Sequence, residues 1–317
     1  MSARVVVTGA TGHLGSYVTH MLAAAGQSVL ALSRSGELPR PPFGSSRGEG
    51  AQVETAALDI ARDVAVNELA PMLGPDTALV HLAAWHPPAT ASTGAADRRR
   101  LLEHNVLGML RVLEAARRGR VHAVVYASSF EVYGLPQCLG PVSEAARLEP
   151  ISDYGASKLA GEDHLLAFAY EEKTRVVALR LPAIYGPGET TLRALPNFLL
   201  QVARGERPCI QGTGEDLRDQ LHVSDAALAV QCALAADGSG IFNVADGQPH
   251  SIRQLAQTAL EVAEMPGAPD YAPAQKPRYD FHMSIAKARR ELSFEPRISL
   301  LEGMREQLGW LRARAGA

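Results

Sequence analysis

Three glycines near the N-terminus constrain the fold of this chain more than any other feature. Gly9, Gly12 and Gly15 in TGATGHLG follow a short apolar run and precede an amphipathic run that stops at Gly26. In a strand–turn–helix unit, the first glycine permits a tight turn, the second lets a phosphate approach the backbone, and the third permits close packing. The helix N-terminus then offers N–H groups and a partial positive charge to an anion. A glycine turn without a ligand is disfavoured by the strand before it and the helix after it.

Strand and helix patterns alternate through the first 180 residues. Apolar runs predict strands at 4–9, 28–33, 53–59, 78–84, 123–129 and 175–181, and helical spacing predicts helices at 17–26, 105–119 and 154–172. Near-continuous apolar strands separated by helices are typical of a parallel sheet covered on both faces. The predicted fold is therefore α/β, a Rossmann-type doubly wound parallel sheet.

The alternation of strand and helix patterns becomes irregular after residue 182. We expect a dinucleotide-binding domain over 1–182 and a smaller, mainly substrate-binding region over 183–317, with part of 220–250 returning to the sheet. Such a region would cover the carboxyl ends of the strands, where ligands of open parallel sheets bind. Two segments rich in Gly, Pro and Ser or Thr, 34–52 and 85–100, are expected to be mobile loops.

Composition narrows the class of protein. The formal net charge of −3 argues against a nucleic-acid surface, which would need a basic excess. Cys138, Cys209 and Cys232 lie far apart without a CxxC pair, which argues against a disulfide framework and a thiolate zinc site. No stretch reaches the ~18 apolar residues of a membrane span, and the N-terminus does not look like a signal peptide. We therefore expect a cytoplasmic protein with no metal site, no nucleic-acid partner and no membrane partner.

One segment, YGASK, places a tyrosine and a lysine one helical turn apart. Tyr154 and Lys158 are at i and i+4, so both side chains can face one site. A free tyrosine titrates near ~10, too high for a base at neutral pH. A nearby ammonium and a nicotinamide cation would each favour the phenolate, and Lys158 could also hold a ribose hydroxyl. An ordinary amphipathic helix is the alternative, but the segment YASSFEVYG (126–134) precedes it at a strand end.

These segments together resemble the extended branch of the short-chain dehydrogenase/reductase superfamily, the NDP-sugar epimerase/dehydratase family. The resemblance covers nearly the whole chain. It rests on the GxxGxxG spacing, Asp59-Ile60, LAA (82–84), YASSFEVYG, YGASK, LRLPAIYGPGE (179–189), GTGEDLRDQLHVSDAALA (212–229) and FNVADG (242–247).

The resemblance implies a set of site residues. Ser129, Tyr154 and Lys158 would be catalytic, with Ser129 bonding the reacting sugar oxygen while Tyr154 moves the proton. Substrate would contact Ser129, Phe130 and Arg218, whose guanidinium would hold a diphosphate. The implied cofactor-binding residues are Gly9, Thr11, Gly12, His13, Leu14, Gly15, Ser33, Arg34, Asp59, Ile60, Leu82, Ala83, Ala84, Asn105, Ser128, Tyr154, Lys158 and Pro182.

Several of these assignments have a plain structural alternative. Asp59 is equally suited to cap a helix N-terminus. Asn105 matches a position that anchors a proton-relay water in the family, or it simply starts a helix. Arg218 could form an ion pair with Asp219 or Asp225. His222 and Asp225 are expected to be structural.

The cofactor is expected to be NAD or NADP, with Ser33 and Arg34 favouring NADP. Where NAD binders usually carry an acidic residue at the end of the second strand, this chain has Ser33 followed by Arg34. Serine does not repel a 2′-phosphate, and arginine can bind one. A solvated loop arginine is the alternative.

Two positions depart from the family pattern. Ala183 replaces an asparagine on the substrate side, which loosens the nucleotide-sugar assignment. Glu131 matches a glutamate that 4,6-dehydratases and some decarboxylases use in catalysis. The Asp or Ser that precedes it in the best-known dehydratases is here Phe130, which donates no proton. A glutamate alone could still act as a base, or it could be a turn residue bonded to the backbone.

Four functions remain open at this point. The first is a nucleotide-sugar epimerase that oxidises and re-reduces C4. The second is a dehydratase or decarboxylase using Glu131, and the third is an NADPH-dependent sugar ketoreductase. The fourth is a non-catalytic dinucleotide sensor or scaffold, which the presence of Ser129, Tyr154 and Lys158 disfavours. By resemblance we also expect a homodimer through the helices at 105–119 and 154–172.

Overall fold

A computed structural model describes residues 4–40, 43, 53–87, 94–135, 140–191, 193–274 and 279–315. Its centre is a seven-stranded parallel sheet in the order β11-β6-β5-β4-β1-β2-β3. The strands are β1 (Arg4–Thr8), β2 (Val29–Ser33), β3 (Val53–Ala57), β4 (Thr77–His81), β5 (Ala123–Ser129), β6 (Arg175–Leu181) and β11 (Gly240–Asn243). The predicted Rossmann-type parallel sheet is thereby confirmed.

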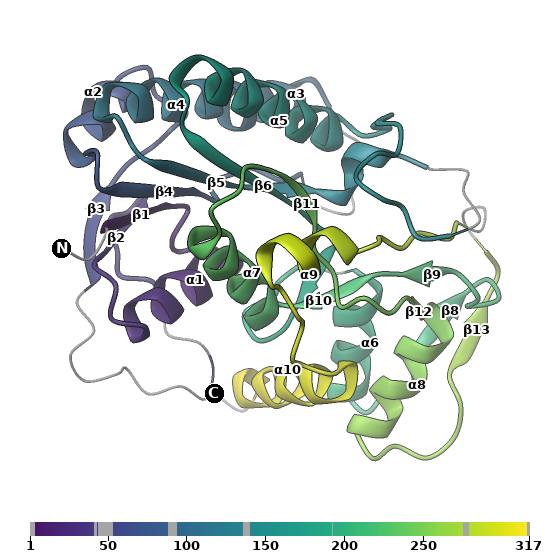
Figure 1. Ribbon diagram of the computed structural model, residues 1–317. Coiled ribbons are helices and arrows are strands. Elements are labelled where there is room, and N and C mark those ends of the chain that lie inside the picture. Colours follow the sequence, from purple (N-terminus) through teal and green to yellow (C-terminus); the bar gives the residue numbers. More distant parts are fainter. Residues whose placement is uncertain are drawn as a thin grey trace.

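Alternate side chains of each strand enter two different cores, one on each face of the sheet. In β1, Val5 and Val7 pack with α1 (His13–Ala24) and α7 (Val223–Ala235), whereas Val6 packs on the other face. That second face is covered by α2 (Ala65–Leu69), α4 (Gly108–Gly119) and α5 (Asp153–Glu172), as Figure 1 shows. Because both faces are buried, the strands are near-continuous apolar runs rather than alternating ones.

The C-terminal part of the chain forms a separate core at one side of the sheet (Figure 1). Its helices are α6 (Ala194–Ala203), α8 (Ile252–Val262) and α10 (Leu300–Ala315), and α9 (Ala286–Leu292) packs on α7. Its short strands pair as β7 (Ala183–Tyr185) with β10 (Gln220–His222), β9 (Leu217–Arg218) with β12 (His250–Ser251), and β8 (Cys209–Gln211) with β13 (Asp270–Ala272). Since only Pro182 separates β6 from β7, this region starts at the carboxyl end of the sheet.

One expected loop contains a helix. The segment 85–100 includes most of α3 (Ala95–Leu101), which continues through a π-helical turn at Leu102–Leu107 into α4. The helix was not predicted because its sequence is mostly charged and only Leu101 is buried, so no apolar periodicity marks it. The start of α3 is stabilised by a cap instead of by buried apolar side chains: the Asp97 carboxylate accepts a hydrogen bond from the Gly94 N–H.

Parts of both expected loops, 41–42, 44–52 and 88–93, lie outside the described residues, as does Cys138. Cys209 and Cys232 are free thiols. Within the described part of the chain, no helix combines the length and apolar character needed to span a membrane.

Candidate active site

The glycine loop is held in its shape by close backbone contacts. Gly9 has a φ of +71°, and a Cβ there would lie 2.7 Å from the backbone of Ala83. A Cβ on Gly15 would lie 2.1 Å from the carbonyl oxygen of Gly9. Among the described residues, no side chain caps the start of α1 at Gly12. The turn therefore presents open backbone N–H groups to an anion, as the sequence predicts.

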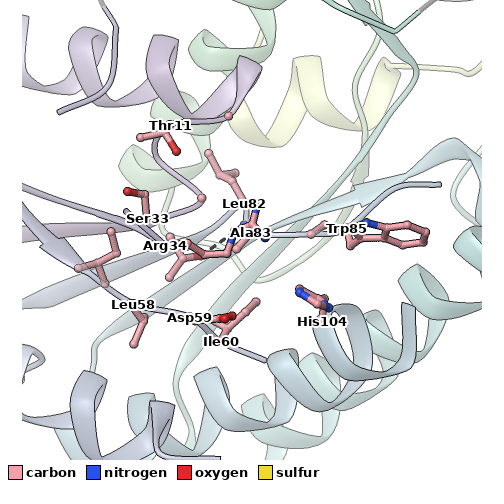
Figure 2. Close-up of a pocket in the computed structure, with 15 residues that line it drawn as sticks. Thr11, Ser33, Arg34, Leu58, Asp59, Ile60, Leu82, Ala83, Trp85 and His104 are labelled. Carbon is pink, nitrogen blue, oxygen red and sulfur yellow. Dashed lines mark hydrogen bonds between the residues drawn. The ribbon is translucent and has the colours of Figure 1, made fainter. Parts of the chain in front are cut away.

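A cavity of about 340 Å³ lies beside this loop, at the carboxyl ends of β1, β2 and β4. Figure 2 shows Ser33, Arg34, Asp59 and Ile60 around it. The Asp59 carboxylate also accepts from the Ala61 N–H at 3.0 Å, so it serves the local turn as well. Predicted cofactor residues make up most of the lining: Gly9, Thr11, Gly12, Ser33, Arg34, Asp59, Ile60, Leu82, Ala83 and Ala84.

A second cavity of about 270 Å³ gathers the catalytic residues. Ser129 ends β5, while Tyr154 and Lys158 lie in the first turns of α5. The strand end and the helix start meet here, which is why residues 25 positions apart share one cavity. Of the predicted residues, the lining contains His13, Leu14, Leu82, Ala84, Ser128, Ser129, Phe130, Tyr154, Lys158 and Pro182.

Two predicted cofactor residues line none of these cavities. Gly15 packs against Gly9, as described above. Asn105 is buried, and its amide donates to the Trp85 carbonyl at 2.9 Å and to Ser157 Oγ at 3.0 Å. Its Oδ1 accepts from the Trp85 N–H at 2.8 Å. Asn105 thus holds the backbone that leaves β4 toward the site.

Burial and neighbouring charges shift the pKa values of both Tyr154 and Lys158. Burial raises the pKa of Tyr154, the charge of Glu131 raises it further, and Arg193 lowers it. Lys158 Nζ donates to the Ala127 carbonyl at 2.7 Å and lies 5.7 Å from the centre of the Tyr154 ring. Burial lowers the pKa of Lys158 to about 8, and Glu162 opposes this. Two cations therefore lie near the Tyr154 side chain: Lys158, which the sequence predicts, and Arg193, which it does not.

A third cavity of about 520 Å³ adjoins the second one on the side of the C-terminal region. It brings together Phe130, Glu131, Ala183 and Arg218, which lie far apart in the sequence. The two cavities share five lining residues, His86, Phe130, Tyr154, Ile184 and Arg193. The two cavities therefore meet beside Tyr154.

Arg218 is held by neighbours other than those considered from the sequence. Its guanidinium donates to the carbonyls of Leu217 and Tyr279, and it lies 3.5 Å from Asp216. Asp219 instead accepts from the Met283 N–H at 2.6 Å. Arg218 thus lines the third cavity while carbonyl groups outside the lining hold its guanidinium in place, an arrangement suited to a cation that contacts a ligand.

His222 and Asp225 have structural contacts. The His222 side chain caps α7 by accepting from the Ser224 N–H. Asp225 accepts from the N–H groups of Arg297 and Ile298 at 3.0 and 2.9 Å. Neither residue lines the two cavities that meet at Tyr154.

Sequence reasoning missed two charged or polar side chains at the junction, His86 and Arg193. They come from loops after β4 and β7, and Arg193 Nη2 lies 3.3 Å from His86 Nε2. No motif or periodicity marks either residue. The only signal was the position of the 85–100 segment directly after a strand whose carboxyl end faces the site.

Comparison with known proteins identifies the family of the chain. A model of the NAD dependent epimerase/dehydratase family matches residues 5–245. The UDP-glucose 4-epimerase of Mycolicibacterium smegmatis is 31% identical, over 98% of this chain and 99% of its own. A dTDP-glucose 4,6-dehydratase of Streptomyces niveus is 31% identical over 74% of this chain and 70% of its own.

The chain also resembles a solved structure that contains ligands. MoeE5 in complex with UDP-glucuronic acid and NAD superposes with a TM-score of 0.82 at 30% identity, over 98% of this chain and 99% of that chain. The matched residues include the glycine loop and the Ser129, Tyr154 and Lys158 segments. The chain belongs to the NAD dependent epimerase/dehydratase family and is an NAD(P)-dependent enzyme of the extended short-chain dehydrogenase/reductase type.

Proposed function

We propose that the protein is a nucleotide-sugar epimerase that oxidises the C4 hydroxyl of its substrate and returns the hydride to the same carbon. The observation that carries this proposal is the junction of two cavities at Tyr154. One cavity continues from the glycine loop, and the other is lined by Arg218, a cation suited to a diphosphate. Two curated relatives that resemble this chain act on nucleotide sugars by their names.

The residues present fit a nicotinamide dinucleotide. The uncapped start of α1 would hold the diphosphate, and the cavity with Arg34 and Asp59 would hold the adenosine. Lys158 would hold a ribose hydroxyl. When bound, the nicotinamide accepts hydride from the sugar carbon and later returns it.

The protein's own part in the reaction is positioning and proton transfer. Ser129 Oγ would bond the sugar hydroxyl oxygen while Tyr154 takes its proton and later gives it back. The ring of Tyr154 is held in the first turn of α5, whose start is capped by Ser152 Oγ accepting from the Gly155 N–H at 2.9 Å. Arg193 lines the same cavities as Tyr154, and its positive charge lowers the pKa of Tyr154, which burial raises, so this charge favours the phenolate.

A dehydratase or decarboxylase is the second candidate, and Glu131 favours it. Burial alone would raise the pKa of Glu131, but its interactions with His86 and Ser152 and the charge of Arg193 bring the pKa below its ordinary value. An ionised carboxylate therefore lines the substrate cavity. Phe130 beside it supplies no acid. An NADPH-dependent ketoreductase is the third candidate, favoured by Arg34 in the adenosine cavity.

The test begins with the purified protein as isolated. Denaturing it and identifying the released nucleotide by absorbance and mass spectrometry distinguishes an internal redox cycle from a cofactor that exchanges. Stoichiometric NAD or NADP supports an epimerase or dehydratase, whereas an empty protein that binds NADPH supports a reductase. The protein is then incubated with UDP-glucose, UDP-glucuronic acid and dTDP-glucose, with products resolved by NMR. A C4 epimer that Tyr154→Phe does not form supports the proposal, and a 4-keto-6-deoxy product overturns it in favour of dehydration.

A further inference from the structure

His86 lies at the junction of the two cavities, next to the catalytic tyrosine. Its ring centre is 4.5 Å from that of Tyr154, and it lines both cavities. About a third of the His86 side chain, 36%, stays exposed. An imidazole in this place can meet both a bound sugar and water, which a fully buried residue cannot.

The two nitrogens of His86 have different partners, and these fix the tautomer of the neutral ring. Nδ1 lies 2.6 Å from the Pro87 carbonyl oxygen, which only accepts, so Nδ1 carries the hydrogen. Nε2 lies 3.3 Å from Arg193 Nη2, which only donates. In the neutral ring Nε2 therefore bears the lone pair, directed at Arg193, which lines both cavities together with His86.

Glu131 is placed to pair with the protonated ring of His86. Its Oε2 accepts from Ser152 Oγ at 2.6 Å, which fixes the carboxylate, and its Oε1 lies 4.0 Å from His86 Nε2. Once Nε2 carries a proton it can no longer accept from Arg193, and the carboxylate becomes its favourable neighbour. Each protonation state of His86 thus has a charged partner in place.

We propose that His86 and Glu131 form a second proton-transfer pair, which moves a proton at a carbon next to the ketone that Tyr154 generates. The proposal rests on the proposed function, since it needs a keto sugar in the cavity. His86 Nε2 acts as the base, and Glu131 stabilises the resulting imidazolium. The pair would allow deprotonation of a carbon adjacent to C4, a step that epimerisation by return of hydride alone does not require.

The step balances without a redox partner. The C–H bond next to the ketone breaks, its electron pair moves into the carbonyl as an enolate, and the proton goes to His86 Nε2. The Arg193 guanidinium, released from Nε2, is then available as a counter-charge for the enolate. Return of a proton from His86 restores the ketone, and because His86 exchanges its proton with water, solvent hydrogen enters the sugar.

Deuterium exchange into a preformed ketone tests this step separately from hydride transfer. The holoenzyme is incubated in D₂O with UDP-4-keto-6-deoxyglucose, and deuterium on the carbons next to the ketone is followed by NMR. Wild type should exchange on the order of 100-fold faster than buffer, the usual range for a positioned base. His86→Gln should exchange at the rate of buffer, and Glu131→Gln should exchange roughly tenfold more slowly than wild type.

His122→Gln is the matched control, because His122 is exposed just before β5, at the end of that strand opposite to Ser129. It should exchange at the wild-type rate. Calorimetry with UDP checks that His86→Gln still folds and binds nucleotide. Exchange no faster than buffer, or unchanged in His86→Gln, overturns the inference. If UDP-sugars fail to reduce the bound cofactor while exchange still depends on His86, the proposed function fails and this inference stands.

Discussion

Arg180 in β6 and Glu162 in α5 form a doubly hydrogen-bonded ion pair in the interior, next to β5, the strand that ends at Ser129. Arg180 Nε and Nη2 donate to the two carboxylate oxygens of Glu162 at 2.9 and 2.6 Å. The side chains are only 2% and 1% exposed. Glu162 also accepts from Ser128 Oγ at 2.5 Å, and Arg180 donates to Tyr133 Oη at 2.8 Å. The pair therefore joins α5, β6 and the segment that carries the catalytic serine.

Removing one member of this pair should destabilise the fold strongly. Glu162→Gln leaves the Arg180 charge buried without a counter-charge, which typically costs about 3–5 kcal/mol. The double variant Glu162→Gln with Arg180→Met removes both charges and should recover a large part of that loss. Urea unfolding of the three proteins measures the difference.

The surface pair of Arg289 and Glu295, 2.7 Å apart, provides the control for that experiment. Both side chains are about half exposed, so Arg289→Met should change the free energy of unfolding by less than about 1 kcal/mol. An equal effect in the surface and buried variants would show that the buried pair is not the structural link described here.

The sequence predicts the sheet and the catalytic side chains because their signals are local. A strand is an apolar run, Tyr154 and Lys158 share a face at four-residue spacing, and the glycine loop follows directly from backbone geometry. The contact of His86 with Arg193 joins residues 107 positions apart, from two segments without periodicity. Such contacts depend on how loops fold over the sheet, so no pattern within either segment predicts them.

Asp219 should make the fold less stable as the pH rises. Burial raises the pKa of Asp219 to about 8, well above that of an aspartate in the unfolded chain. Between pH ~4 and 8 the folded state therefore binds more protons than the unfolded state. The stabilisation is complete below the unfolded pKa and is lost as the pH rises through about 8. Asp219→Asn cannot ionise, yet its side-chain oxygen can still accept from the Met283 N–H.

Unfolding free energies of wild type and Asp219→Asn, measured from pH 5 to 8, test this. Wild type should lose stability relative to the variant across that range, by at most about 1.4 kcal/mol for each pH unit. Parallel curves for the two proteins would mean that Asp219 is ionised in the folded state throughout.

Tyr154→Phe should abolish turnover and leave cofactor binding intact. The phenol oxygen is the only group lost, and the ring keeps its packing against His86, 4.5 Å between centres. Loss of a general acid–base group costs roughly 100-fold or more in rate. Product formation from UDP-glucose and nucleotide retention after gel filtration provide the two measurements. Near-wild-type activity in the variant would remove Tyr154 from its proton-transfer role.

Arg34 should favour NADP over NAD. It lines the adenosine cavity together with Ser33, and neither side chain repels a 2′-phosphate. A guanidinium–phosphate hydrogen bond contributes about 1.5–3 kcal/mol, so Arg34→Glu should weaken NADP binding by about 10- to 100-fold. Binding of NAD should change little. Calorimetry with both dinucleotides measures this, and Arg62→Glu, outside the cavity on an exposed segment, is the control. Tighter binding of NAD than NADP by wild type would contradict the preference.

Apolar side chains exposed on α4, α5 and the π-helical turn should hold two copies of the chain together. These side chains are Leu102, Leu107, Leu110, Leu166 and Tyr170, between 37% and 77% exposed. The two helices lie side by side on the same face of the sheet (Figure 1), so their exposed stripes can form one surface. Apolar area of this kind on a folded protein marks an association site.

We expect a homodimer in solution, in which α4 and α5 of each copy pack as four helices. Leu110→Lys combined with Leu166→Lys should give a monomer, because two charges would be buried without partners in the interface. Tyr271→Lys, at an equally exposed apolar residue on β13, should remain dimeric. Light scattering after gel filtration reads out the mass. A monomeric wild type would contradict the dimer, and a dimer that survives both lysines would place its interface elsewhere on the molecule.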